Sequence, residues 1–141
     1  MYKISTRGQY ALLIMEDLAS NTDDKYVPLK LLSHRRNLSV KYLEQILIHL
    51  SKAGLVTGSR GISGGYKLSK DANDYTVGEI LRVMEGDLSP QGTFETNTII
   101  SEGNKKFWKN FESKINDYVD SVTLDKLAKT TSEFVGYEYC I

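Results

Sequence analysis

Residues 29–68, LKLLSHRRNLSVKYLEQILIHLSKAGLVTGSRGISGGYKL, decide the fold of this chain. Pro28 precedes them, at a position where the first turn of a short helix tolerates its missing N–H. Ser39 can cap a second helix and Gly54 can end it in a left-handed conformation, which predicts a helix over 40–53. Two amphipathic helices joined by a tight connection are typical of a helix-turn-helix motif.

A glycine-rich segment follows the two helices. The runs 55–57 (LVT) and 66–68 (YKL) favour β-strand, and the connection between them, GSRGISGG, contains four glycines. This pattern predicts a β-hairpin. A nucleotide-binding loop is the weaker interpretation, because no GK[ST] follows and no helix begins at Gly65. A hairpin placed directly after a helix-turn-helix indicates a winged helix.

Two further helices flank this motif in the sequence. Apolar residues at helical spacing predict a helix over 6–20. Downstream, Thr76 and Glu79 form a capping box, so a helix is expected up to Glu85. Together with the motif, these helices predict a winged helix-turn-helix domain over residues 1–86.

The remainder of the chain has a different pattern. Residues 87–103 show no sustained period and are expected to form a loop, and a long helix is predicted over 104–121. A short helix over 124–129 and an aromatic-rich tail over 134–141 follow. Apolar residues of the long helix step by three and four, the spacing of helices that pack side by side: Trp108, Phe111, Ile115, Tyr118 and Val122. We therefore predict a mainly α fold with a small β-hairpin wing, in which residues 104–141 provide a dimerisation helix and a C-terminal tail.

The formal net charge of zero conceals a strong asymmetry. Residues 1–70 contain 11 Lys and Arg against 5 Asp and Glu, whereas residues 71–141 contain 7 against 13. A basic half suits a polyanion, because each neutralised phosphate releases condensed counterions. The alternative is an uneven distribution of charge on a solvated surface, and asymmetry alone does not decide between the two.

Polar side chains on the predicted 40–53 helix could contact base edges. Its outer face would carry Lys41, Glu44, Gln45, Ile48 and Lys52. In a major groove, glutamine can pair with adenine, glutamate can accept from cytosine and lysine can reach guanine or phosphate. Taken alone, such a face is more often merely solvated, but its position beside a wing favours DNA. In that wing, Arg60 lies between glycines and could enter a narrow minor groove.

Five blocks of sequence carry a family resemblance: STRGQYAL (5–12), YLEQIL (42–47), AGLV (53–56), RGISGGYKLS (60–69) and TVGEILRVMEG (76–86). In this order they resemble the bacterial winged-helix regulators that include the iron–sulfur regulator IscR, the nitric-oxide sensor NsrR and the cysteine-metabolism repressor CymR. The later segment TLDKLA (123–128) is most similar to the CymR branch.

The resemblance implies a sequence-specific DNA-binding regulator, a homodimer that usually represses. It also implies control of cysteine and sulfur metabolism, with a cysteine-biosynthetic enzyme as a candidate regulatory partner. Glu44 and Gln45 would contact bases, Arg60 the minor groove, and Ser5, Thr6 and Arg7 phosphates. The complete set of expected DNA-binding residues is Lys3, Ser5, Thr6, Arg7, Ser39, Lys41, Tyr42, Glu44, Gln45, Arg60, Gly61, Gly64 and Gly65. The alternative is a winged-helix adaptor that binds protein, since fold alone does not fix the ligand.

Residue types argue against several other classes of protein. Cluster-binding relatives place three cysteines before the long helix, whereas residues 88–107 contain none, which predicts no iron–sulfur cluster and no metal cofactor. Cys140 is a candidate redox thiol, although an inert thiol is the more usual case. No paired carboxylates or nucleophile motif indicate an enzyme. With no long apolar stretch and no signal peptide, we expect a cytoplasmic protein without membrane contact.

Overall fold

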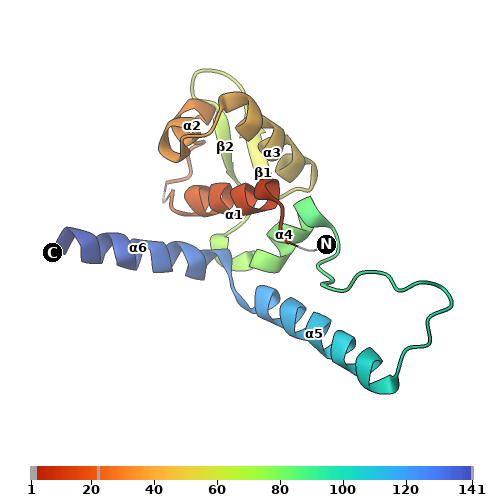
Figure 1. Cartoon of the computed structure of the whole chain (residues 1–141). Coiled ribbons are helices and arrows are strands. Elements are labelled where there is room, and N and C mark those ends of the chain that lie inside the picture. Colours follow the sequence, from red (N-terminus) through yellow and green to blue (C-terminus); the bar gives the residue numbers. More distant parts are fainter. Residues whose placement is uncertain (1–2, 22, 141) are drawn as a thin grey trace.

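The computed structural model describes the backbone of residues 3–21 and 23–140, and the side chains up to residue 134. It is mainly helical with one two-stranded antiparallel hairpin, which confirms the predicted fold class. Figure 1 shows α1 to α4 and the hairpin gathered together, with α5 on the side away from the wing. The elements in order are α1 (Thr6–Ala19), α2 (Leu29–Arg36), α3 (Val40–Lys52), β1 (Val56–Ser59), β2 (Gly65–Leu68), the 3-10 helix η1 (Ala72–Asp74), α4 (Val77–Glu85), α5 (Glu102–Ser121) and α6 (Leu124–Cys140).

Local capping explains where two of the helices begin. The Ser39 side chain accepts a hydrogen bond from the Tyr42 amide (3.1 Å), and the Thr76 side chain accepts from the Glu79 amide (3.1 Å). Each bond satisfies an amide that has no partner inside its own helix. The Ser39 cap is as predicted. Of the predicted Thr76–Glu79 capping box the structure shows the Thr76 half, whereas the Glu79 carboxylate accepts from the Lys70 amino group (3.4 Å).

The core lies between α1 and the helix-turn-helix. α1 contacts α3, α4, α6 and β2, and it is therefore the central helix of the fold. α3 was predicted to include Ala53, whereas the structure ends the helix at Lys52 and places Ala53 as its exposed C-cap residue. The fully buried side chains of the core are Ala11, Ile14, Met15, Leu32, Leu43, Ile46, Leu47, Leu50, Tyr75, Ile80 and Leu124.

Backbone hydrogen bonds tie the hairpin to the segment that precedes α2. Val27 and Tyr66 exchange two backbone hydrogen bonds of 2.8 and 2.9 Å. At the neighbouring Gly65, φ is +144°, and a Cβ would collide with the Val27 carbonyl. Only glycine suits this position. The strands pair from Val56 with Leu68 to Ser59 with Gly65, so the connecting loop is shorter than predicted.

Tyr75 joins the base of the wing to the core. Its ring is fully buried, and its hydroxyl donates to the Leu55 carbonyl (2.6 Å) while accepting from the amides of Ser69 (3.0 Å) and Lys70 (3.2 Å). Burial raises the pKa of this phenol, and the two amides oppose that shift. The hydroxyl therefore fixes the segment that leads from β2 to α4.

We expect Tyr75→Phe to lower the free energy of unfolding by about 1–2 kcal/mol, because Leu55 and two amides lose a partner while the ring still fills the core. Urea denaturation measures this change. Tyr26→Phe is the matched control, since Tyr26 is half-buried and lies outside both the core and the α5 stripe. Equal stabilities of the two variants would contradict the assigned role of the Tyr75 hydroxyl.

The C-terminal helix differs from its prediction. A helix over 124–129 and a tail were expected, whereas α6 continues to Cys140. Two threonines that favour helix ends are accommodated here: Thr130 donates to the Lys126 carbonyl (2.9 Å), and Thr131 donates to Glu16 of α1. The contact with α1 is non-local, which explains why local patterns underestimated the length of α6.

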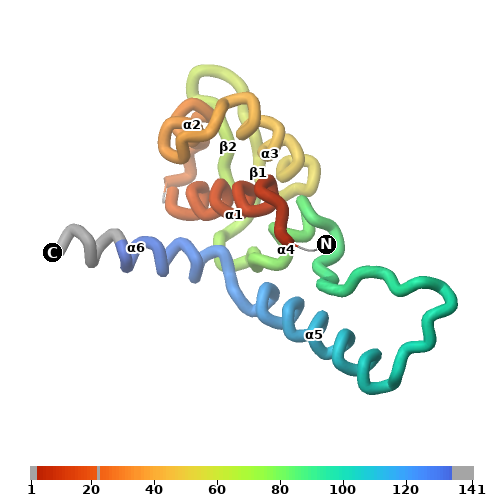
Figure 2. Tube along the Cα trace, viewed as in Figure 1, coloured from red at the N-terminus to blue at the C-terminus, as the bar shows by residue number. Residues whose placement is uncertain are grey.

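The connection between α4 and α5 runs out beyond both helices, as Figure 2 shows. α5 begins at Glu102, two residues earlier than expected, because Ser101 caps it through the Asn104 amide (3.2 Å).

In the described part of the chain, no helix is both long enough and apolar enough to cross a membrane.

Candidate nucleic-acid interface

The outer face of α3 is solvent-accessible. Lys41, Glu44, Gln45 and Lys52 are all exposed, and Ile48 is 42% exposed. Because the opposite face of the same helix is fully buried in the core, the direction of this face is fixed. α3 therefore presents polar and apolar groups together, as contact with base edges in a major groove requires.

The first turn of α1 adjoins this face. The Arg7 Nη2 atom lies 3.5 Å from the Gln45 Oε1 atom, and Lys3 and Thr6 are exposed nearby in the sequence. Arg7 and Gln45 are 38 positions apart, and no local pattern in the sequence indicates their contact. The structure thus joins one predicted phosphate-contacting residue to one predicted base-contacting residue.

Ser5 has partners that the sequence did not reveal. Its amide and its hydroxyl both donate to the Glu85 carboxylate, at 2.7 and 2.5 Å. The hydroxyl also accepts from the Gly8 amide (3.0 Å), which caps α1. The end of α4 therefore holds the first turn of α1 in place, and Ser5 is half-buried rather than open to solvent.

A hollow of about 330 Å³ separates α3 from the wing. Arg60, which lines the hollow, and the neighbouring Gly61 are exposed, whereas Gly64 is buried against the backbone of the same loop. Ile48 and Lys52 line the hollow as well, so it continues the exposed face of α3. Two of its lining residues, Ser51 and Ser59, were not among the expected DNA-binding residues. The full lining consists of Ile48, Ser51, Lys52, Gly58, Ser59, Arg60 and Tyr66.

Ser39 and Tyr42 lie at the start of α3. Ser39 is exposed and caps the helix, while Tyr42 is half-buried and packs edge-to-face on Tyr10, with ring centroids 5.8 Å apart. A role in fixing α3 is therefore visible for both residues, and DNA contact by either one stays a prediction.

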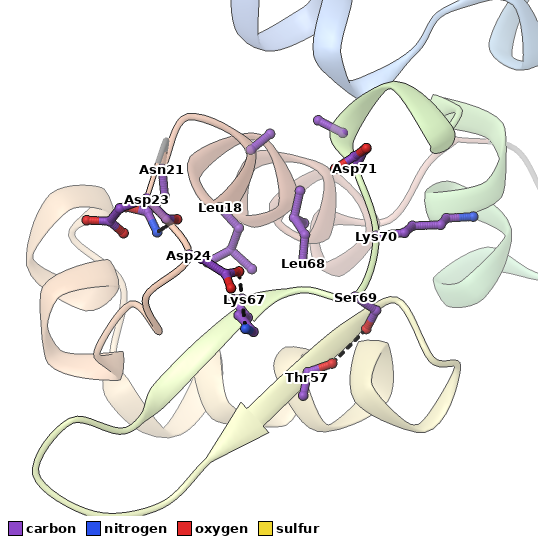
Figure 3. A pocket seen from close by; sticks show the side chains of 12 residues that line it. Leu18, Asn21, Asp23, Asp24, Thr57, Lys67, Leu68, Ser69, Lys70 and Asp71 are labelled. Atoms are coloured by element: carbon purple, nitrogen blue, oxygen red, sulfur yellow. Dashed lines mark hydrogen bonds and ion pairs between the residues drawn. The ribbon is translucent and has the colours of Figure 1, made fainter.

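A larger hollow of about 420 Å³ lies on the other face of the hairpin, between the end of α1 and β2. Figure 3 shows the Lys67 amino group turned toward Asp24 (3.2 Å) and the Thr57 hydroxyl toward Ser69 (3.0 Å). Lys67 is a cation of the basic half of the chain, but it does not join the exposed face of α3, because successive side chains of a strand alternate between faces. The structure places it away from α3, paired with a carboxylate.

Two arginines of α2 likewise form ion pairs with one carboxylate. Asp17 of α1 is 2% exposed, and its oxygens accept from Arg35 Nη1 (2.7 Å) and Arg36 Nε (2.8 Å). A buried charge of this kind requires paired and hydrogen-bonded neighbours. These two ion pairs hold α2 against α1. Because α3 follows α2 after a short turn, they also help to position α3.

The predicted dimerisation stripe of α5 is accessible. Phe111 and Tyr118 are exposed, and Trp108 and Ile115 are half-buried. Phe107, which the prediction omitted, is 56% exposed and packs against the Trp108 ring at 5.0 Å. Val122 follows the last residue of α5, and its carbonyl accepts from the Val77 amide of α4 (2.9 Å).

Comparison with known proteins identifies relatives across most of the chain. Residues 4–130 match the Rrf2 family, described as iron-dependent transcriptional regulators. The regulator CymR of Bacillus subtilis is 38% identical over 92% of this chain and 91% of its own length. The regulator IscR of Photobacterium profundum is 32% identical over 90% of this chain and 76% of its own length. The solved structure of CymR, described as the global cysteine regulator of B. subtilis, matches 92% of this chain and 98% of that chain with a TM-score of 0.83.

These comparisons correct the prediction about cofactors. A cluster had been excluded because residues 88–107 lack cysteine, yet the matched family is described as iron-dependent and includes relatives named IscR. Cysteine count alone was therefore too weak a basis for that exclusion. Among the residues whose side chains are described, no group of three or more His, Cys, Asp or Glu is placed to hold a metal ion. The described residues do not form a ligand set for iron, and Cys140 lies outside them.

Proposed function

Because this chain belongs to the Rrf2 family of transcriptional regulators, we propose that it represses genes of cysteine and sulfur metabolism, as CymR of B. subtilis is described as a global cysteine regulator. The chain is a DNA-binding regulator of the helix-turn-helix type. The observation that carries the mechanism is the exposed outer face of α3, with Gln45 beside Arg7 and the wing hollow beyond it.

In this mechanism α3 enters the major groove. Glu44 and Gln45 contact base edges, and Lys41 and Arg7 contact phosphates. Arg60 at the exposed tip of the wing enters the adjacent minor groove, where a narrow groove strengthens the attraction of a guanidinium. The hollow between α3 and the wing accommodates the strand that separates the two grooves.

Two copies act together on one operator. The apolar stripe of α5 pairs the copies, and their α3 helices then contact half-sites about one helical turn apart, roughly 34 Å. Residues 1–86 form the DNA-binding domain in this arrangement, and residues 104–141 contribute the pairing helix. A cysteine-biosynthetic enzyme as regulatory partner is a further expectation, and co-sedimentation of the two purified proteins tests it.

Two substitutions on α3 separate base contacts from phosphate contacts. Gln45→Ala is expected to lose about 1–3 kcal/mol of discrimination at one base pair, because a bidentate contact is removed. Lys41→Ala is expected to weaken binding to every sequence and to reduce the slope of log affinity against log salt by about 0.9. Fluorescence anisotropy at several salt concentrations, on duplexes selected from a random library, measures both effects.

Lys126→Ala is the matched control, since Lys126 is exposed on α6. Its affinity and salt slope should equal those of the unmodified protein. If Gln45→Ala and Lys41→Ala weaken all duplexes uniformly, base contact by α3 is wrong. If the unmodified protein binds no duplex even at low salt, DNA binding is wrong and the chain is better explained as a winged-helix adaptor that binds protein.

A further inference from the structure

A cluster of three side chains joins α4 to α5. The Arg82 guanidinium donates from Nη1 to Asp120 Oδ1 (2.7 Å), and from Nη2 to Asp120 Oδ2 (3.0 Å) and Asn116 Oδ1 (2.6 Å). The guanidinium lowers the pKa of the Asp120 carboxyl, and the carboxylate raises the pKa of Arg82, so both groups stay charged near neutral pH. We refer to Arg82, Asn116 and Asp120 as the Arg82 cluster.

The two helices approach closely beside this cluster. A Cβ at Gly78 would collide with the Asp120 carboxylate and lie 3.0 Å from Val119. The Val77 amide, five residues before Arg82, also donates to the Val122 carbonyl (2.9 Å). The contact between α4 and α5 is therefore anchored at two separate points, which fixes an angle as well as a distance.

This contact orients a helix that is otherwise weakly held. None of the described residues of α5 is buried, and α5 packs against α4. The side chains of Arg82 and Asp120 are 34% and 45% exposed, and exposed ion pairs contribute little to stability. A bidentate arginine contact still imposes a definite geometry, because its two parallel bonds allow one mutual orientation.

We propose that Arg82 is a positioning residue that sets the distance between the two α3 helices of the dimer, and with it the half-site spacing that the regulator selects. The proposal rests on the proposed function, because it requires pairing through α5. Neighbouring base pairs are about 3.4 Å apart along B-DNA, so a displacement of α3 by that amount corresponds to one base pair of spacing. A change of angle at the Arg82 cluster moves the two α3 helices relative to each other and therefore shifts the preferred spacing.

The test uses duplexes that carry two identical half-sites separated by spacers of different length. The unmodified protein should prefer one spacer. Arg82→Met keeps most of the aliphatic part of the side chain but removes the guanidinium. Asp120→Asn removes the negative charge that the guanidinium contacts. Each is expected to reduce the preference between neighbouring spacers by about two- to fivefold, the range for a partly exposed ion pair.

Three measurements distinguish positioning from stability. Affinity for a single half-site, the dimer fraction in sedimentation and the thermal midpoint should stay near those of the unmodified protein in both variants. Lys109→Met on exposed α5 is the matched control and should keep the original spacer preference. Arg82→Lys retains charge without the bidentate geometry, so its spacer preference should be intermediate.

The outcomes separate the two proposals. If the unmodified protein is monomeric or binds no duplex, the proposed function fails. If it is a dimer that selects one spacer and both variants select it as sharply, the assignment of Arg82 is overturned. Equal loss of affinity on every spacer, or dissociation of the variants, would assign Arg82 to stability and would overturn the proposal as well.

Discussion

Asp17→Ala is expected to lower the free energy of unfolding by about 2–4 kcal/mol. The Asp17 carboxylate is almost fully enclosed, and it accepts from both Arg35 and Arg36. Its removal leaves two guanidinium groups facing an apolar gap between α1 and α2. The arginine side chains are 43% and 32% exposed, so they regain part of their hydration, which keeps the loss below the upper limit for a buried pair.

Urea denaturation followed by circular dichroism measures the loss. Asp24→Ala is the matched control, because Asp24 also pairs with a basic side chain but is 98% exposed. We expect no measurable change for that variant. If both substitutions shift the urea midpoint equally, or neither shifts it, the buried pair is not what holds α2 against α1.

DNA binding should respond to the same substitution. α2 and α3 are joined through Asn37, which adopts a left-handed conformation with φ of +53°. A loosened α2 therefore changes the direction in which α3 leaves the turn. At temperatures where Asp17→Ala remains folded, we expect weaker binding to all duplexes without a change in base preference, since no base-contacting side chain is altered.

The parts of the fold that sequence predicted well are those fixed by neighbouring residues. The Ser39 and Thr76 side chains cap amides three positions away, so each signal and its structural effect lie within a single turn. The same holds for the stripe on α3, where buried and exposed residues alternate with the helical period. Glu44 and Gln45 are exposed as predicted, because the helical period places them on the side of α3 opposite its buried residues.

Contacts between distant segments explain most of what the sequence missed. Ser5 meets Glu85 across 80 positions, and Asp17 meets Arg36 across 19. Aspartate on the buried face of an amphipathic helix contradicts the usual pattern, and only its two arginine partners account for it. The partners of such groups depend on how helices pack, which residue spacing along one helix does not determine.

The exposure of the expected DNA-binding residues was predicted better than the contacts that hold them in place. Arg7, Glu44, Gln45 and Arg60 are exposed, and Arg7 lies beside Gln45, while DNA contact by these residues stays a prediction. Gly64 and Gly65 are required by the backbone of the hairpin, where a Cβ would meet carbonyl oxygens. A family resemblance does not separate such structural glycines from residues expected to contact DNA, because both types lie in the same sequence block.

Trp108→Ala combined with Ile115→Ala is expected to convert the proposed dimer into monomers. Both residues lie in the accessible stripe of α5, and the Trp108 ring anchors an aromatic cluster with Phe107 and Phe111. Its indole Nε1 is enclosed yet has no acceptor among the described residues, and an acceptor from a second copy would satisfy it. Central aromatic and aliphatic anchors contribute about 2 kcal/mol each, and a symmetric dimer loses four of them, so dimerisation should weaken by at least about a thousandfold.

Analytical ultracentrifugation over a range of protein concentrations measures this change, and operator binding should fall with the dimer fraction while single half-site binding persists. Ile99→Ala is the matched control, since Ile99 is an apolar side chain 98% exposed outside α5. A double variant that still sediments as a dimer would move the interface to another surface, such as α6 around Phe134, which is 65% exposed. In that case the angle between α4 and α5 could no longer set the separation of the two α3 helices.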